Sequence, residues 1–300
     1  MPHDVMSGAL LAAEAKEIKP ILCIYHGNCA DGFGAAWVIH EWATLTHIQV
    51  EFFAAVYQTG LPKDTDLEER EIYIVDFSYK LPQLLELAEK AKSIVILDHH
   101  KSAAEDLQNL VHPKINVHFD MEHSGAILTW NHFFPNDIPP PLLLHIEDRD
   151  LWRFALPNTR EIHANVFSYP YDFAIWDQLM QAKIATHIIS GVAIERKHHK
   201  DIAELVKACM CWGNIAGYVV PVVSLPYTLG SDAGHYMAET FAPDAFAACY
   251  YDTPNGRCFS LRSIDKGVDV SAVAKKFGGG GHARAAGFTV PNDTINIHPK

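Results

Sequence analysis

A carboxylate and two imidazoles occur side by side in this chain. Asp98, His99 and His100 directly follow an aliphatic segment, residues 94–97. One imidazole of such a turn can ligate a metal ion, while its neighbour points elsewhere and meets a substrate. A turn capped by an aspartate would explain the same three residues, so their function depends on what lies near them.

Similar side chains occur beyond other apolar segments of the chain. They are His26, Asp31, Asp76 and Asp148. A ligand set rich in oxygen and imidazole suits Mn²⁺ or Mg²⁺ better than a structural zinc ion. Two such ions held close together activate water at neutral pH and clamp the attacking and leaving oxygens of a phosphoryl transfer. The residues therefore predict a hydrolase of phosphate esters.

The segments that would position these side chains alternate between strands and helices. Residues 21–25, 72–75 and 94–97 are short and apolar, as buried parallel strands are. A helix is expected over residues 35–42, begun by a glycine turn at 32–34, and a second helix between the later two strands. Parallel sheets bind ligands at the carboxyl ends of their strands, where the aspartates and histidines lie.

A second block of elements follows a long helix expected over residues 184–208. Its strands are expected at 218–223, 245–251 and 258–261, around a helix at 232–241. The polarity of the long helix is typical of a connector between domains. The sequence thus predicts an α/β protein with a second, smaller α/β unit.

The expected domains divide the chain near the end of this connector. Residues 1–190 would form a catalytic, metal-binding domain with a parallel sheet and flanking helices, and a helical linker would extend to about residue 208. Residues 209–300 would form a C-terminal domain that binds the substrate through a glycine-rich loop.

Four consecutive glycines at 278–281 would weaken any regular element, unless the backbone must approach another group closely. Glycine also lets successive N–H groups point at an anion, and a histidine and an arginine follow that could add charge-assisted hydrogen bonds. A flexible loop is the alternative interpretation. The candidate substrate-binding residues are Gly279, Gly280, Gly281, His282 and Arg284, with Arg262 as a second phosphate anchor.

Composition restricts the class of substrate. The chain has 300 residues, of which 49% are hydrophobic, and its formal charge is -12. Such a charge argues against long duplex nucleic acid, because binding it requires many lysines and arginines. The six cysteines form no C-x-x-C pair, and no apolar stretch approaches the ~20 residues of a membrane span, so we expect reduced thiols, no membrane partner and a cytoplasmic location.

Two common nucleotide-binding motifs do not occur in the sequence. Gly27, Gly32 and Gly34 follow the first expected strand but lack the G-x-G-x-x-G spacing, and no Walker motif ending in Gly-Lys-Ser/Thr is present. Neither a nicotinamide cofactor nor a P-loop nucleotide is supported.

In these motifs the chain resembles the DHH phosphoesterases with the associated C-terminal glycine-rich domain, in the style of bacterial nanoRNases. The likeness runs from about residue 21 to 288. Its motifs are His26 to Gly32, Val75-Asp76, Asp98-His99-His100, Asp148 ahead of Trp152-Arg153-Phe154, and Ser260 to Ser263 with the glycine run to His282. In that family the first domain holds two Mn²⁺ ions, and the second domain closes over them.

The resemblance also implies a role for each matching residue. Asp76 would bridge the two metals, and His26 would belong to one of the sites. The other site would be completed by Asp31, His99 and Asp148. His100, with Asp98, would act on the scissile phosphate. Arg262, the glycines and His282 would hold the rest of the nucleotide.

One departure from the family pattern concerns the first motif. Where the family carries D-x-D, this chain has Cys29 before Asp31, and His26 lies one residue nearer than usual. Cysteine could ligate as a thiolate, water could replace the missing carboxylate, or that site could be weak. Asp150 is an additional carboxylate that could compensate.

These observations predict a two-metal hydrolase of short oligonucleotides or dinucleotides, using Mn²⁺, with Mg²⁺ as an alternative. A pyrophosphatase or exopolyphosphatase-like enzyme and a cyclic-dinucleotide phosphodiesterase share the same chemistry. A nucleotide-binding regulator with weak catalysis is a further alternative, suggested by Cys29. The expected partner is a nucleotide or short single-stranded oligonucleotide, and association into a homodimer stays open.

Overall fold

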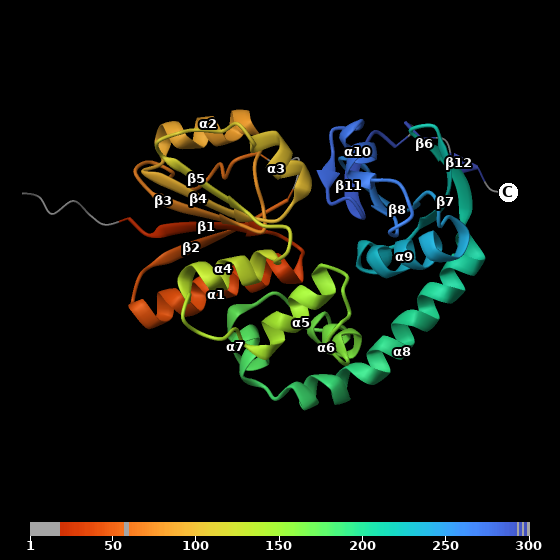
Figure 1. Ribbon diagram of the computed structural model, residues 1–300, viewed down its shortest axis with the longest axis horizontal. Coiled ribbons are helices and arrows are strands. Elements are labelled where there is room, and N and C mark those ends of the chain that lie inside the picture. Colours follow the sequence, from red (N-terminus) through yellow and green to blue (C-terminus); the bar gives the residue numbers. More distant parts are fainter. Residues whose placement is uncertain (1–18, 57–59, 293, 296, 299–300) are drawn as a thin grey trace, which may run out of the picture.

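A five-stranded sheet and a seven-stranded sheet are joined by the long helix α8 (Ile184–Cys209), as Figure 1 shows. The computed structural model describes residues 19–56, 60–292, 294–295 and 297–298. The predicted α/β class, with a parallel sheet, a helical connector and a smaller C-terminal α/β unit, is confirmed.

The first sheet is parallel throughout, with the strand order β2-β1-β3-β4-β5. Its strands are β1 (Ile21–His26), β2 (Val50–Ala55), β3 (Glu71–Val75), β4 (Ser93–Asp98) and β5 (Ile115–Phe119). Ile24, Ile74 and Ile96 on the three central strands are fully buried. Burial on both faces explains why these strands read as continuous apolar runs.

Helices cover both faces of this sheet (Figure 1). Leu22 and Ile24 of β1 face a core shared with α2 (Leu81–Lys90) and α3 (Lys101–Leu107), whereas Cys23 faces the core of the opposite side. That second core includes α1 (Ala30–Thr46), α4 (Gly125–Phe133), α5 (Pro141–Asp150), α6 (Thr159–Val166) and α7 (Phe173–Gln181).

The prediction of a glycine turn before the first helix is wrong. Helix α1 already begins at Ala30, so Gly32 and Gly34 lie inside its first turns. A Cβ on Gly32 would lie 2.2 Å from the carbonyl oxygen of His26. The glycine is therefore required for the close packing of α1 on the end of β1, which brings Asp31 beside the strand ends.

The second sheet has the order β10-β11-β9-β8-β7-β6-β12 and is antiparallel except between β7 and β8. Its strands are β6 (Cys211–Ile215), β7 (Tyr218–Ser224), β8 (Ala247–Thr253), β9 (Gly256–Arg262), β10 (Gly280–Gly281), β11 (Ala285–Val290) and β12 (Ile297–His298). Val222 and Val223 illustrate the period of two, since each faces a different core.

Helices cover both faces of this sheet as well. One face packs on α9 (Gly230–Phe241), which follows the short 3-10 helix η1 (Tyr227–Leu229), and on the end of α8. The other face packs on α10 (Val270–Lys275). None of the helices in the described ranges is both long and apolar enough to cross a membrane.

The units built on the two sheets contact each other at two places. On one side, β10 and α10 contact α3: Gly281 N–H donates to Ser102 Oγ at 2.9 Å, and Lys101 Nζ lies 2.5 Å from the Asp269 carboxylate. On the other side, Arg149 of α5 pairs with Asp232 of α9 at 2.9 Å. The C-terminal unit is therefore held over the strand ends of the first sheet.

Gly191 lies where helix α8 packs closely against α6. A Cβ at Gly191 would lie 1.7 Å from the Glu161 carbonyl oxygen of α6, whereas a Cβ at Gly60 would meet nothing within 4 Å. We expect Gly191→Ala to lower the free energy of unfolding by about 1–3 kcal/mol, because two backbones must move apart. Chemical denaturation measures this. Equal stability of Gly191→Ala and the control Gly60→Ala would contradict the packing.

Candidate metal centre

The predicted ligands meet where three parallel strands end. His26 is the last residue of β1, Asp98 is the last residue of β4, and Asp76 directly follows β3. Asp76 has a φ of 52°, a left-handed conformation that turns the chain sharply at the strand end. Gly125 is required beside it, because a Cβ there would lie 2.4 Å from the Asp76 Cβ.

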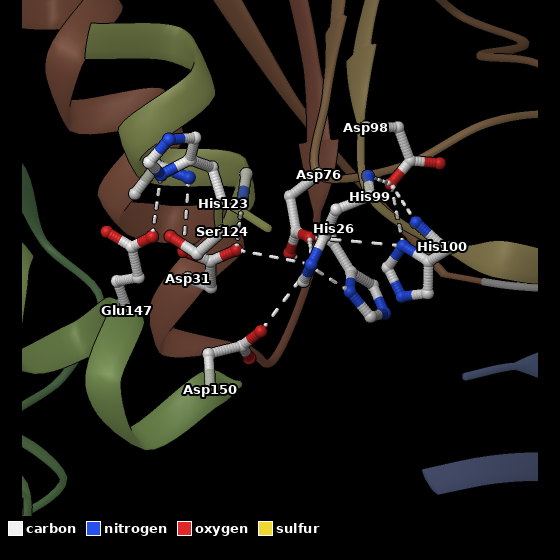
Figure 2. A network of polar contacts seen from close by, with 12 residues as sticks. His26, Asp31, Asp76, Asp98, His99, His100, His123, Ser124, Glu147 and Asp150 are labelled. Atoms are coloured by element: carbon white, nitrogen blue, oxygen red, sulfur yellow. Dashed lines mark hydrogen bonds and ion pairs between the residues drawn. The ribbon is translucent and has the colours of Figure 1, made fainter. Parts of the chain in front are cut away.

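His99 lies at the centre of the cluster, as Figure 2 shows. Its Nε2 atom is 3.0 Å from Asp76 Oδ1, 3.6 Å from Asp31 Oδ2 and 3.5 Å from Asp150 Oδ2. His26 approaches Asp76 from the other side, with 3.3 Å between Nδ1 and Oδ2. Asp76 thus lies between two imidazoles, as expected for a carboxylate that bridges two cations.

Three groups of side chains bring potential ligand atoms within 4.8 Å of one another. They are Asp31, His99 and Asp150; His26, Asp76 and His100; and His99, His100 and His282. The first two combine carboxylate oxygens with imidazole, the donors that Mn²⁺ accepts.

The electrostatics of the centre favour a bound cation. Burial, together with the charges of Asp76 and Asp150, raises the pKa of Asp31 well above its usual range. Burial acts in the same direction on Asp76, but hydrogen bonds with His26 and His99 outweigh it and hold its pKa well below the usual range. Without a metal, part of the negative charge is balanced by the proton of an imidazole.

That proton is on His99. Burial alone would favour the neutral ring, but Asp76, Asp150 and Asp31 outweigh it and raise the pKa of His99 to about 10. The imidazolium therefore occupies the position in which a divalent cation would balance the same carboxylates. His99 Nδ1 is buried and makes no hydrogen bond with the described residues. The donor set fits Mn²⁺ or Mg²⁺.

His100 is oriented by Asp98. The Asp98 Oδ1 atom accepts hydrogen bonds from His99 N–H at 2.8 Å and His100 N–H at 3.3 Å, and lies 2.7 Å from His100 Nδ1. The carboxylate fixes the orientation of the ring. None of the ligand groups found among the described residues includes Asp98.

His282 reaches the centre from the C-terminal unit. Its ring stacks on His100 with 4.5 Å between centroids and lies 4.7 Å from His99. Burial and the neighbouring charges of His100 and His99 lower the pKa of His282 well below its ordinary value, so its ring is neutral. The structure brings this predicted residue to the metal centre.

Asp148 is predicted as a metal ligand, but none of the ligand groups found among the described residues includes it. Its Oδ1 accepts from Ala155 N–H at 2.8 Å, and its Oδ2 accepts from Leu156 N–H at 3.1 Å and Thr159 Oγ1 at 2.6 Å. Asp148 fixes the loop that follows α5. Asp150, the tentative candidate, reaches the cluster instead because it lies about half a helical turn further on.

Cys29 adds a thiol and not a negative charge. It precedes α1, and none of the ligand groups found among the described residues includes it. Burial, and then the charges of Asp76, Asp150 and Asp31, raise its pKa well above the ordinary value. A neutral thiol is a poor ligand for hard cations, so Cys29 does not replace a carboxylate here.

The glycine run serves close packing in the structure. The N–H of Gly279 donates to Ala274 O at 3.0 Å and that of Gly281 to Ser102 Oγ. A Cβ on Gly280 would lie 2.6 Å from Ser102 Oγ. The prediction that successive glycine N–H groups point at an anion is therefore wrong for Gly279 and Gly281.

Arg284 is also not in the site. Its guanidinium donates to the carbonyl oxygens of Gly267 at 2.9 Å and Asp265 at 2.7 Å, so it braces a loop. Arg284 thus stabilises the C-terminal unit itself, whereas the glycine run packs on Ser102 of the other unit. Nothing in the local sequence distinguishes these roles from ligand binding.

Arg262 lies at the end of β9, beside a cavity of about 160 Å³. In the described residues its hydrogen bonds go to neutral oxygens, namely Ser260 Oγ and Leu261 O at 2.8 Å and Ser231 Oγ at 2.7 Å. Burial lowers its pKa to about 10, which leaves it cationic at neutral pH. A buried cation held by neutral groups is suited to an anionic ligand.

Two aromatic residues of this cavity were not predicted. Tyr227 and Tyr251 both line it, with 6.1 Å between their ring centroids. Ser102, the contact of the glycine run, was also missed. These residues come from separate segments, and their sequence neighbourhoods carry no motif that would have singled them out.

Asp148 and Asp150 allow a direct test of this assignment. We expect Asp148→Asn to weaken buried, charge-assisted hydrogen bonds and to lower stability by about 1.5–3 kcal/mol. Asp150→Asn, which is partly exposed, should stay near wild-type stability and lose Mn²⁺ affinity. Thermal unfolding and calorimetric titration measure the two effects. The reverse pattern would return the ligand role to Asp148.

Comparisons with known proteins agree with this architecture. Residues 235–297 match the DHHA1 domain. An uncharacterized protein of Acanthamoeba polyphaga mimivirus is 29% identical over 288 residues, which cover 88% of this chain. The chain spans 66% of the length of that relative.

Solved structures show a similar arrangement at low sequence identity. RecJ from Thermus thermophilus, in complex with Mn²⁺, has a TM-score of 0.51 at 14% identity over 91% of this chain and 50% of that one. A pGpG-specific phosphodiesterase from a Vibrio species has a TM-score of 0.45 at 15% identity over 91% and 94% of the two chains. The chain therefore has a fold like that of about half of RecJ, and its residues 235–297 match the DHHA1 domain.

Proposed function

We propose that the chain is a divalent-metal-dependent phosphoesterase that hydrolyses phosphodiester bonds in short oligonucleotides or dinucleotides. The observation that carries the proposal is the meeting of Asp31, Asp76 and Asp150 around His99 Nε2 in a buried centre. Carboxylates this close together require a cation. The RecJ structure named above was crystallised with Mn²⁺, which supports the choice of ion.

Two ligand sets would share Asp76. His99, Asp31 and Asp150 would hold one ion, and His26 would hold the other. When bound, two divalent cations supply a lowered pKa for the attacking water and neutralise charge on the phosphoryl oxygens. The carboxylates keep the centre anionic enough to retain both ions, and the burial of His99 and Asp76 limits competition from bulk water.

The histidines outside this ligand set would contact the phosphate. Because Asp98 holds His100 Nδ1, the Nε2 atom would donate to a non-bridging oxygen of the scissile phosphate. His282 stacks on His100 and would cover the reacting phosphate from the C-terminal side. Ser102 positions the segment before His282, through its hydrogen bond with Gly281.

The cavity beside Arg262 supports a nucleotide as the substrate. Leu225, Phe259 and the two tyrosines supply apolar and aromatic surface, and Arg262 supplies a positive charge near Asp150 and His282. A nucleobase stacks on such rings while its phosphate meets the arginine. A site for inorganic polyphosphate would instead be lined with lysine and arginine.

Asp76→Asn tests the bridging carboxylate. Asparagine tolerates the left-handed φ of this position, so the backbone should keep its turn while the charge is lost. We expect the rate of dinucleotide hydrolysis with Mn²⁺ to fall by more than about 100-fold, since residues that only orient ligands are worth about 10–100-fold. Asp201→Asn, on the surface of α8, is the control and should keep its activity. An active Asp76→Asn enzyme would refute the metal mechanism.

Tyr227→Ala tests the nature of the substrate. Loss of base stacking, worth about 1–3 kcal/mol, should raise KM for a dinucleotide by about 10–100-fold. The hydrolysis of pyrophosphate or polyphosphate should not change. Tyr236→Ala, an exposed tyrosine elsewhere on the C-terminal unit, serves as control. Wild-type rates that are highest on polyphosphate or a cyclic dinucleotide, with no effect of Tyr227→Ala, would assign the alternative substrate.

A further inference from the structure

A buried cluster of charged and aromatic side chains joins α9 to α5, beside the metal centre. The Asp232 carboxylate lies 2.9 Å from Arg149 Nη2 of α5, 3.5 Å from Arg160 Nη1 of α6 and 3.1 Å from His198 Nε2 of α8. Its side chain is only 14% exposed, and that of Arg149 is 11% exposed. One carboxylate of the C-terminal unit thus ties together three helices of the rest of the chain.

Burial distinguishes this contact from the ion pairs at the other place where the units meet. Lys101–Asp269 and Lys275–Glu105 have side chains that are 31–48% exposed, and exposed pairs of this kind contribute little. A buried pair that loses one partner leaves an uncompensated charge. The Asp232–Arg149 pair is therefore more buried than the two ion pairs that join α3 to the C-terminal unit.

The arginines of the cluster also hold the loop that follows Asp150. Arg149 lies over the Trp152 ring, 4.1 Å from its centroid, and Arg160 lies over the Phe154 ring at 3.8 Å. Trp152 and Phe154 both have positive φ, 57° and 47°. Bulky residues adopt this conformation only where the surroundings impose it. The end of α5 is consequently fixed from the C-terminal unit.

Arg149 and Asp150 are consecutive residues whose side chains contact different parts of the molecule. Arg149 pairs with Asp232, and Asp150 Oδ2 lies 3.5 Å from His99 Nε2. A shift of the α5 backbone at Arg149 would therefore also displace Asp150, a candidate metal ligand.

Two consecutive residues of α9, Ser231 and Asp232, connect the Asp232–Arg149 ion pair to the cavity beside Arg262. Ser231 accepts from Arg262, and Asp232 accepts from Arg149. Gly234 allows close contact, because a Cβ there would lie 2.8 Å from Arg262 Cγ. The first turn of α9 and the proposed phosphate anchor therefore move as one body.

We propose that Asp232 is a positioning residue: its ion pair with Arg149 couples the contact between α9 and α5 to the placement of Asp150 in the metal centre. The proposal rests on the function proposed above. Asp232 is not among the residues proposed to hold substrate or metal, and it acts through Arg149. Where this ion pair is broken, Asp150 would be the ligand that is out of place, and the cation would be held by the remaining residues alone.

The test measures Mn²⁺ affinity by calorimetry and the radius of gyration by X-ray scattering, on the full chain. We expect Asp232→Asn to weaken one Mn²⁺ site by about tenfold or more and to enlarge the molecule. Asp150→Asn should weaken the same site without enlarging it, and Asp232→Asn should add no further loss of affinity in the Asp150→Asn background. Asp252→Asn, which breaks an ion pair with Arg257 within the C-terminal unit, is the matched control.

A second variant guards against misfolding. Asp232→Asn combined with Arg149→Met removes both charges of the most buried pair and leaves only the more exposed partners Arg160 and His198 without the carboxylate; it should show the same weakened Mn²⁺ binding. Wild-type Mn²⁺ affinity in these variants would overturn the coupling. So would a loss of Mn²⁺ affinity on adding Asp232→Asn to Asp150→Asn that equals the loss caused by Asp232→Asn alone. The proposed phosphodiesterase function is tested separately on the wild-type chain. If that chain binds Mn²⁺ but hydrolyses no phosphodiester, the function is contradicted, while the coupling can still be measured through Mn²⁺ affinity.

Discussion

Three neighbouring carboxylates repel one another in the metal centre, and the rest of the structure must hold them together. Asp31, Asp76 and Asp150 approach one imidazole nitrogen from three separate elements, in a largely buried position where water screens them only weakly. Such a group is stable only with a cation among its members, and the His99 proton takes that place when metal is absent. Affinity for divalent ions and the chemistry of phosphate esters both follow from this local excess of negative charge.

The surrounding fold can be understood as the means of bringing those charges together. Parallel strands end at one edge and deliver His26, Asp76 and Asp98, and glycines at positions 32 and 125 allow helices close enough to add Asp31 and to seat Asp76. The C-terminal unit then supplies His282 and Arg262. Catalytic groups lie on the first sheet's side, whereas the aromatic and cationic surface that suits a nucleotide lies on the other.

Much of this arrangement could be predicted from local sequence, because buried parallel strands have a recognisable apolar pattern and each ends in a candidate ligand. The predictions failed where distant contacts decide. The local sequence does not distinguish Asp148 from Asp150 as a metal ligand. The hydrogen bonds that Asp148 accepts from residues 155, 156 and 159 show that it holds the loop after α5. Likewise, a glycine run predicts close approach but not its partner, which is Ser102 of a different unit.

Calorimetric titration of the metal-free chain with Mn²⁺, in buffers of different ionisation enthalpy, tests the central claim most directly. A His99 pKa of about 10 means that the free centre carries a proton at neutral pH, and a metal ligand must be neutral. The account predicts saturable binding that releases at least the proton of this ring and tightens as pH rises. Absence of binding, or binding without proton release, would contradict it.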